Sequence, residues 1–463
     1  MNKIKEKADY CLNCKTKPCS VKGCPLNNDI PSFINAIKQE QYEKAYEILT
    51  KTTVLPSICG RICPHYKQCM GSCVRGIKGE PVRIGEIEAF IGDMAIKNNY
   101  KIKQLSQEKD LYEVNMIYEE KKINNLNSIE NENKQKRIAI IGGGPAGLTA
   151  AAFLTRAGNK VTIYEKYDYL GGLLVHGIPE FRLPREIIKK SIDKILELGI
   201  DVKYNRELGR NIDLKDLENE YDNIILAFGA NVSSKINIEG ESLKGVFGAN
   251  ELLEYNNHSN YEEKIVVVNG GGNVAMDAAR TIKRLGAKKV IVVYRRAREQ
   301  MPAEQKEIED AINEGIEFLY LHKIVRIIGG NTQYQNTKNM NLKEYTENND
   351  LHFSENDIVK KIELIKTELI EKHGEKRLVP VEIENSNYFM DVDYVVMAIG
   401  SSPADFIKNI GLELNEKGYI KVDENGLTSN PKIYAIGDLA GNISTVAWAA
   451  RSGRNVANQI NLT

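Results

Sequence analysis

Residues 137–168 read RIAIIGGGPAGLTAAAFLTRAGNKVTIYEKYD, and this stretch decides the fold. It combines an apolar strand (137–141), a glycine-rich turn, an alanine-rich helix (146–157) and a second strand that ends in Glu165. Such a strand–helix–strand unit is typical of a parallel sheet with a nucleotide site at its first turn. The uncharged run 138–155 would pass a crude membrane filter, but its glycines favour the strand–turn–helix interpretation.

The glycines of this turn follow the dinucleotide-binding fingerprint. Gly142, Gly144 and Gly147 fit the pattern G-x-G-x-x-G. The first permits a tight turn, the second lets the backbone approach a pyrophosphate, and the third lets the helix pack against the strand. The pyrophosphate would lie at the helix N-terminus, whose unpaired N–H groups attract anions. Glu165 is placed to accept hydrogen bonds from an adenosine ribose.

A late segment indicates that this first nucleotide is FAD. Gly437 and Asp438 follow a short strand (432–436) and resemble the second flavin motif of flavoproteins with two dinucleotide domains. In such proteins the aspartate binds the ribityl chain, and the next helix, here expected near Thr445, points its N-terminus at the flavin. The alternative is that Asp438 is only a turn residue. The predicted FAD contacts are Gly142, Gly144, Pro145, Ala146, Gly147, Glu165, Gly172, Leu173, Gly437, Asp438, Thr445 and Val446.

A second strand–helix–strand unit, KIVVVNGGGNVAMDAARTIKRLGAKKVIVVYRR, occupies residues 264–296. Its turn has the form G-x-G-x-x-A, and its second strand ends in arginines rather than an acid. An acid there would repel a 2′-phosphate, whereas arginines bind one, so the site should prefer NADPH to NADH. The alternative is a solvated surface run. The predicted NADPH contacts are Gly270, Gly272, Asn273, Val274, Ala275, Tyr294, Arg295 and Arg296, with Arg298 nearby.

The eight cysteines all lie between residues 11 and 73. Eight thiolates could hold two 4Fe–4S clusters or two zinc ions. The spacings are longer than in the usual paired zinc motifs, and a flavin can split a hydride into the single electrons that clusters carry, so we expect clusters. The two runs are Cys11-x2-Cys14-x4-Cys19-x4-Cys24-Pro25 and Cys59-x3-Cys63-Pro64-x4-Cys69-x3-Cys73.

The predicted fold class is α/β, with two Rossmann-like dinucleotide-binding domains preceded by an α-helical two-cluster iron–sulfur domain. Helical patterns cover 30–37, 42–49 and 84–96, and residues 331–357 look like a solvated hairpin tip or insertion. The expected parts are a helical iron–sulfur domain (1–120), a polar linker (121–136), an FAD-binding domain (137–232 and 401–463) and an NADPH-binding domain (233–400).

Charge and the N-terminal sequence exclude some classes of protein. The 463 residues include 63 basic and 63 acidic ones, which argues against a general nucleic-acid binder. The first residues, MNKIKEKADY, contain neither an apolar core nor a cleavage site for secretion. We therefore expect a cytoplasmic protein that binds no membrane.

Across nearly its whole length the chain resembles one family of electron-transfer flavoproteins. The family includes the small (β) subunit of NADPH-dependent glutamate synthase, the flavin and cluster domains of dihydropyrimidine dehydrogenase, and the large subunit of electron-bifurcating ferredoxin:NADP oxidoreductase. The stretches that carry the resemblance are CLNCKTKPCSVKGCP, CGRICPHYKQCMGSCVRG, PVRIGEIEAF, IIGGGPAGL, GGLLVHGIPEFRLP, NGGGNVAMDAAR, VVYRRAREQMPA, AIGSSP and YAIGDLAG.

The resemblance implies cluster ligands that cross between the two cysteine runs. One cluster would be held by Cys11, Cys14, Cys19 and Cys73, and the other by Cys24, Cys63, Cys69 and Glu88. Cys59 would then not be a ligand. The alternative interpretation of Glu88 is a helix-surface glutamate, and whether Cys59 or Glu88 completes the second cluster stays open at this point.

The resemblance also implies an enzyme, an NADPH-dependent oxidoreductase. Hydride would pass from NADPH to FAD, and single electrons would pass through the clusters to a protein acceptor, with no particular catalytic side chain required. The acceptor would be a glutamate synthase large subunit or a ferredoxin-type partner, in an oligomer or hetero-complex. The alternatives are the NADP-binding subunit of a bifurcating complex and a non-catalytic, redox-sensing binding module.

Overall fold

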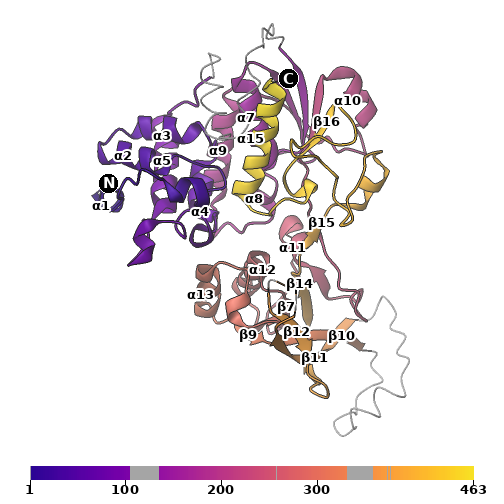
Figure 1. Cartoon of the computed structure of the whole chain (residues 1–463). Helices are drawn as coiled ribbons and strands as arrows, with labels where there is room; N and C mark the ends of the chain where they lie inside the picture. Colours follow the sequence, from indigo (N-terminus) through magenta and orange to yellow (C-terminus); the bar gives the residue numbers. More distant parts are fainter. Residues whose placement is uncertain are drawn as a thin grey trace. The chain divides into compact units, whose positions relative to one another are not determined.

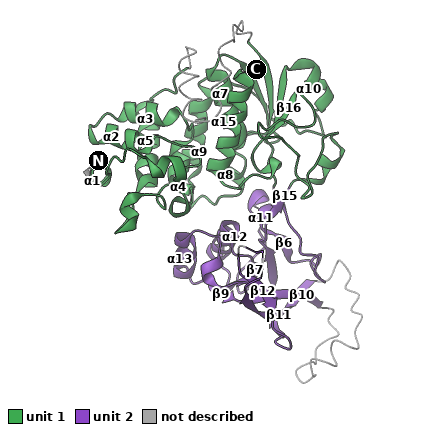
Figure 2. Cartoon of the chain, viewed as in Figure 1, with its two compact units in different colours: residues 1–230, 403–463 green, residues 231–402 purple. Residues whose placement is uncertain are grey.

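The computed structural model describes residues 2–104, 135–256, 258–330 and 358–462, except 373 and 376. Most of the predicted linker (121–136) and the whole predicted insertion (331–357) lie outside the described residues. The chain forms two compact units, which Figure 2 shows in two colours. Unit 1 comprises residues 1–230 and 403–463, and unit 2 comprises residues 231–402.

The N-terminal part of unit 1 is helical, as its apolar spacing predicts. In α2, Ile30, Phe33, Ile34 and Ile37 recur at helical spacing and are buried, and the Asp29 carboxylate caps the helix by accepting the Ser32 N–H at 3.3 Å. The elements are α1 (Asn2–Asp9), η1 (Cys19–Gly23), α2 (Ile30–Lys38), α3 (Tyr42–Thr50), α4 (Pro56–Ile62), η2 (His65–Lys67), η3 (Val74–Ile77) and α5 (Ile84–Asn98).

The rest of unit 1 is built on a parallel five-stranded sheet with the strand order β16-β4-β1-β2-β3. Figure 1 shows α15, from the end of the chain, lying beside α7. The elements are β1 (Arg137–Ile141), α7 (Pro145–Arg156), β2 (Lys160–Tyr164), α8 (Leu173–His176), α9 (Arg185–Leu196), β3 (Asp201–Lys203), α10 (Leu214–Glu220), β4 (Asn223–Leu226), η6 (Asp405–Asn409), β16 (Ile433–Ala435), η7 (Gly437–Ala440) and α15 (Val446–Leu462).

The two parts of unit 1 share one hydrophobic core. Leu49 and Ile58 of the helical part belong to the same buried cluster as Leu154 and Ile195 of the sheet part. The helical part is therefore packed onto the sheet part rather than tethered to it.

Unit 2 contains a second parallel sheet, with the order β6-β14-β7-β8-β9, and an antiparallel sheet formed by β10, β11, β12 and β13. Its elements are β5 (Val232–Ser233), β6 (Val246–Gly248), α11 (Ala249–Tyr255), β7 (Ile265–Asn269), α12 (Asn273–Arg284), β8 (Lys289–Tyr294), η5 (Arg298–Gln300), α13 (Gln305–Asn313), β9 (Glu317–Tyr320), β10 (His322–Gly330), β11 (Ile358–Ile370), β12 (Val379–Glu382), β13 (Tyr388–Asp391), β14 (Tyr394–Met397) and β15 (Ser401–Ser402).

The predicted α/β class with two Rossmann-like sheets is confirmed. In both units the glycine-rich turn follows the central strand of a parallel sheet, β1 or β7, at its carboxyl end, where such sheets bind ligands. The uncharged run 138–155 forms β1 and α7, as its glycines predict. Among the described residues, each helix is too short or too polar to cross a bilayer.

Candidate functional site

The first glycine-rich turn leaves no room for side chains at two of its glycines. Gly142 has a φ of +107°, and a Cβ there would lie 2.7 Å from the Ala227 carbonyl oxygen. A Cβ at Gly147 would lie 2.0 Å from the Gly142 carbonyl oxygen. The turn therefore closes tightly onto the N-terminus of α7, where a pyrophosphate would meet free N–H groups.

A second glycine loop lies against the first one. The Gly171 N–H donates to the Gly143 carbonyl at 2.9 Å, and Gly172, with a φ of +52°, begins α8 just before Leu173. A Cβ at Gly172 would approach the Gly144 Cα to 3.1 Å. The two loops thus face each other with bare backbone, and side chains at these glycine positions would fill the space between the loops. This arrangement suits a ligand that must approach the main chain closely.

Glu165 is held at the end of β2, beside the same turn. Its Oε2 accepts the Gly143 N–H at 2.8 Å, and its Oε1 accepts the Tyr167 N–H at 3.1 Å. Glu165 is 5% exposed, and burial raises its pKa while these backbone donors act in the opposite direction. The carboxylate is therefore fixed where the fingerprint predicts a ribose contact.

The late flavin motif lies against the first turn, although it comes some three hundred residues later. A Cβ at Gly437 (φ +67°) would lie 3.2 Å from the Ala146 Cβ, and a Cβ at Gly453 would lie 2.2 Å from the Ala146 carbonyl oxygen. Helix α15 begins at Val446, as predicted, and the Thr445 Oγ1 accepts the Trp448 N–H at 3.4 Å. The close packing of α15 on α7 thus joins both halves of the predicted flavin site.

Asp438 is the acidic group of that late motif. Burial raises its pKa to about 6, and a hydrogen bond from Ser444 partly offsets the increase. A half-buried carboxylate with one hydroxyl partner retains acceptor capacity for ligand hydroxyl groups. Together with the glycine loops and Glu165, this residue fits FAD.

The second turn, in unit 2, repeats these steric features. A Cβ at Gly270 (φ +152°) would lie 2.1 Å from the Ala398 carbonyl oxygen, and one at Gly271 would lie 2.5 Å from the Tyr294 ring. Tyr294 is 8% exposed, and its hydroxyl donates to the Gln300 carbonyl at 2.8 Å. The structure therefore gives Tyr294 a supporting position beneath the turn, with its hydroxyl already engaged.

The remaining predicted residues of this site open helix α12. Gly272 caps the helix and Asn273 is its first residue, followed by Val274, which is 38% exposed, and Ala275, which is fully buried. Among the described residues, the nearest neighbour of a Cβ at Gly272 would be the Pro302 side chain, at 4.0 Å. The backbone at Gly272 is therefore accessible to a ligand. This half of the turn fits a pyrophosphate.

The arginines after β8 differ in what they contact. Arg295 and Arg298 are exposed and form no ion pair with any described residue. Arg296 is half-buried, and its Nε donates to the Leu378 carbonyl at 3.3 Å. Arg295 and Arg298 are therefore the better candidates for a 2′-phosphate, and sequence reasoning did not separate them from Arg296.

A loop that the sequence analysis did not predict supports this turn through two hydrogen bonds. The Ala303 N–H donates to the Gly271 carbonyl at 3.0 Å, and the Glu304 N–H donates to the Asn273 Oδ1 at 2.9 Å. Met301 and Ala303 are buried. The signal was present in the stretch VVYRRAREQMPA, which carried the family resemblance without showing this contact.

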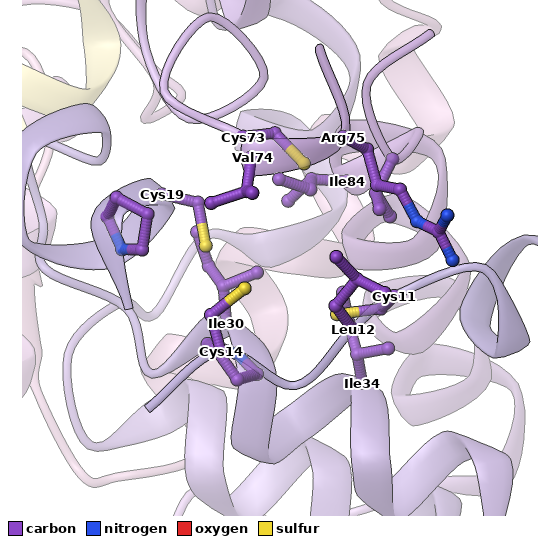
Figure 3. A pocket seen from close by; sticks show the side chains of 13 residues that line it. Cys11, Leu12, Cys14, Cys19, Ile30, Ile34, Cys73, Val74, Arg75 and Ile84 are labelled. Carbon is purple, nitrogen blue, oxygen red and sulfur yellow. The ribbon is translucent and has the colours of Figure 1, made fainter. Parts of the chain in front are cut away.

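Four cysteines from the two runs surround one pocket. Cys73 lies with Cys11, Cys14 and Cys19 around a hollow whose floor is apolar and includes Ile34 (Figure 3). Burial, followed by the nearby Cys73 and Cys11, raises the pKa of Cys19 to about 11. Bound iron displaces such thiol protons, and soft thiolates are the ligands that iron–sulfur clusters require. The donor set therefore fits a cluster, and the ligand assignment stays a prediction.

The other group contains the half-buried Cys24 and Cys63 and the buried Cys69. Burial and the nearby Glu88 carboxylate raise the pKa of Cys24 to about 12. Burial also raises the pKa of Cys69, and the nearby Cys24 and Glu88 add to this increase. A hydrogen bond with Cys59, together with burial, holds the pKa of Cys63 well above its usual range. All these groups therefore share one neighbourhood, which includes Cys59.

Glu88 lies in this group rather than on a helix surface. It is 6% exposed, burial raises its pKa to about 8, and the Asn28 Nδ2 donates to its Oε1 at 3.2 Å. No cationic side chain in the described part of the chain pairs with it. A buried carboxylate of this kind needs a compensating charge, and iron would supply one.

Neither group forms a site for a single metal ion in the part of the chain that the structure describes. Within the described ranges, no three His, Cys, Asp or Glu side chains lie close enough together to bind one metal ion. A four-iron cluster takes its cysteine ligands on separate irons, so it does not require three ligands gathered around one ion.

Comparison with known proteins identifies the family to which each part of the chain is similar. Residues 136–453 match the pyridine nucleotide-disulphide oxidoreductase family, and residues 1–100 match dihydropyrimidine dehydrogenase domain II, 4Fe-4S cluster. The glutamate synthase [NADPH] small chain of Escherichia coli is 32% identical over 98% of this chain and 90% of its own length. The NADP(+)-dependent formate dehydrogenase subunit beta of Moorella thermoacetica is also 32% identical, over 96% of this chain and 59% of its own length.

Solved structures show the same fold. FprA of Mycobacterium tuberculosis, in complex with NADPH, aligns with a TM-score of 0.59 at 20% identity, over 71% of this chain and 85% of FprA. The N-terminal match establishes 4Fe–4S chemistry, and the longer match establishes FAD and NADPH as cofactors. The chain belongs to the family of FAD- and iron–sulfur-containing NADPH oxidoreductases that includes the glutamate synthase small chains.

Proposed function

We propose that this enzyme oxidises NADPH and delivers the electrons, through FAD and two 4Fe–4S clusters, to a protein acceptor as the small subunit of a glutamate synthase. One observation carries the proposal. Both flavin motifs, all eight cysteines and Glu88 belong to one compact unit, and its helical and sheet parts share a single core. A rigid connection of this kind is what repeated electron transfer between fixed cofactors requires.

The residues of the chain hold and tune the cofactors. Bound FAD and bound clusters supply the change from two-electron hydride chemistry to single electrons. Gly144 and Gly172 would present open backbone to the pyrophosphate, and Glu165 and Asp438 would accept hydrogen bonds from hydroxyl groups of FAD. Arg295 selects NADPH through the 2′-phosphate.

The glutamate synthase assignment is supported by the length of the chain rather than by identity, which is 32% for both relatives. This chain spans 90% of the Escherichia coli small chain but only 59% of the Moorella subunit beta. The names of these relatives make them parts of larger assemblies. The acceptor of this chain would be a large subunit that carries the glutamate-forming chemistry, in the cytoplasm, where thiols stay reduced.

A second candidate is the NADP-binding subunit of a complex that reduces a ferredoxin-type partner. It is favoured by the equal identity, 32%, to a formate dehydrogenase subunit and to glutamate synthase small chains. The same sites would serve both functions, because only the acceptor differs.

Reconstitution with candidate acceptors separates the two. The anaerobically purified chain is combined either with a glutamate synthase large subunit from the same genome or with a ferredoxin, and NADPH oxidation is followed, with NADH as the control nucleotide. The first proposal predicts glutamate formation that depends on both chains and on NADPH. Ferredoxin reduction without glutamate formation would establish the second candidate instead.

A further inference from the structure

A fully buried arginine connects the flavin helix to the cluster domain. Arg454 lies on α15, the helix that follows the late flavin motif, and its relative exposure is 0%. Its Nη1 donates to the Leu26 carbonyl and to the Thr52 carbonyl, both at 2.8 Å. Both acceptors belong to the helical part of unit 1, so one guanidinium on the flavin side binds two separate loops of the cluster side.

From these loops, hydrogen bonds lead to Glu88. The Thr52 hydroxyl donates to the Asn28 Oδ1 at 2.7 Å, and the Asn28 Nδ2 donates to the Glu88 Oε1 at 3.2 Å. Thr52 and Asn28 are each 1% exposed, so water does not compete for these bonds. The orientation of the Glu88 carboxylate is therefore set by a short chain of buried contacts that starts at Arg454.

The same helix also holds the main chain next to Cys24. Leu26, whose carbonyl binds Arg454, follows Cys24 and Pro25 directly, and the Arg451 Nη1 donates to the Pro25 carbonyl at 3.2 Å. Arg451 also lies over the Trp448 ring, with its Cζ 5.0 Å from the ring centroid. Two arginines of α15 thus hold the segment that carries Cys24, and Arg454 also leads to Glu88 through Thr52 and Asn28.

We propose that Arg454 is a positioning residue for the cluster site formed by Cys24, Cys63, Cys69 and Glu88. It fixes the Cys24 segment and, through Thr52 and Asn28, the Glu88 carboxylate. Its buried positive charge also favours the reduced form of that cluster, since net charge and hydrogen bonds set cluster potentials. This inference rests on the proposed function in one respect, namely that a cluster occupies the site.

The chain offers a matched control on the neighbouring helix. Arg156 on α7 is 3% exposed, and it also binds two carbonyls of the helical part, Thr50 at 2.7 Å and Lys103 at 2.8 Å. The Thr50 hydroxyl, however, donates to the Glu47 carbonyl at 3.2 Å and so does not lead to Glu88. Arg156 thus shares the burial and the docking role of Arg454, while the threonine that it binds leads to Glu47 instead of Glu88.

The test compares Arg454→Met, Arg454→Lys, Thr52→Val and Arg156→Met in the full chain, loaded with its cofactors. Iron per chain, the melting temperature, and the EPR signal and midpoint potential of each cluster are measured. Arg454→Met should lower the potential and change the signal of one cluster only, and Arg454→Lys should partly restore both. Thr52→Val, which keeps the shape and removes the hydroxyl, should change the same signal.

The control fixes the interpretation. Arg156→Met should lower the melting temperature and leave both potentials unchanged. The inference fails if Arg454→Met and Thr52→Val leave both clusters like wild type, or if Arg156→Met shifts a potential as much as Arg454→Met does. If Arg454→Met does not fold, Thr52→Val decides alone. A wild-type chain without iron would instead overturn the proposed function, and this inference with it.

Discussion

Replacing Arg295 should change the choice between NADPH and NADH. Arg295 is exposed and forms no ion pair with any residue that the structure describes, so Arg295→Ala breaks no existing interaction. What is lost is one charge-assisted contact to a 2′-phosphate, worth about 1.5–3 kcal/mol. That corresponds to a loss of roughly 10- to 150-fold in NADP affinity. Affinity for NAD, which lacks the phosphate, should not change, and neither should the melting temperature.

Calorimetric titration of the oxidised protein with NADP⁺ and NAD⁺ measures this directly. Arg210→Ala is the control, because this side chain is 81% exposed in unit 1, where its partner is Glu207. The control should bind both nucleotides like wild type. An Arg295→Ala variant that loses affinity for both nucleotides equally, or for neither, would refute the assignment of the 2′-phosphate site.

Three further predictions concern unit 1. In Gly147→Ala, a Cβ would lie 2.0 Å from the Gly142 carbonyl oxygen. We therefore expect the free energy of unfolding to fall by about 1–3 kcal/mol or more and the variant to bind less flavin. A wild-type ratio of flavin absorbance to protein absorbance would contradict this expectation. In the flavin-free protein the pKa of Asp438 is raised to about 6, so its ionised form destabilises the fold above that pH. This destabilisation disappears as the pH falls from that value towards the ordinary pKa of an aspartate. At about pH 7.5, Asp438→Asn should therefore increase the free energy of unfolding by up to about 3 kcal/mol and so raise the melting temperature. This gain should shrink below about pH 6. A gain that does not depend on pH would contradict burial of the charged carboxylate as the cause. If Glu88 is the fourth ligand, Glu88→Ala should reduce iron from about eight to about four per chain while Cys59→Ala keeps about eight, and the reverse result would assign the site to Cys59.

Much of the fold could be predicted because its decisive residues act locally. Gly142 is required by its own positive φ of +107° and Gly147 by its contact with the Gly142 carbonyl oxygen, and the apolar strand before them needs no distant partner to be identified. The second unit repeats the pattern with Gly270. The start of α15 at Val446 could also be placed, because a strand and a Gly-Asp turn precede it.

Other features depend on contacts that no spacing encodes. The approach of Cys73 to Cys11 was implied by the family resemblance, not by the intervals between cysteines. Tyr294 was expected to contact the nucleotide, which stays a prediction, and no spacing showed that its ring would pack against Gly271, which has no side chain. The partners of Arg454 lie more than four hundred residues earlier in the chain, so its role becomes visible only once the core is assembled.

Anaerobic reduction by NADPH tests the central claim most directly. The purified chain is analysed for iron and flavin and then titrated with NADPH, while the flavin absorbance and the EPR signals of reduced clusters are followed together. The account predicts about eight irons and one FAD per chain, bleaching of the flavin by NADPH far more readily than by NADH, and reduced-cluster signals that grow with it. Zinc in place of iron, or a flavin that stays oxidised in excess NADPH, would contradict it.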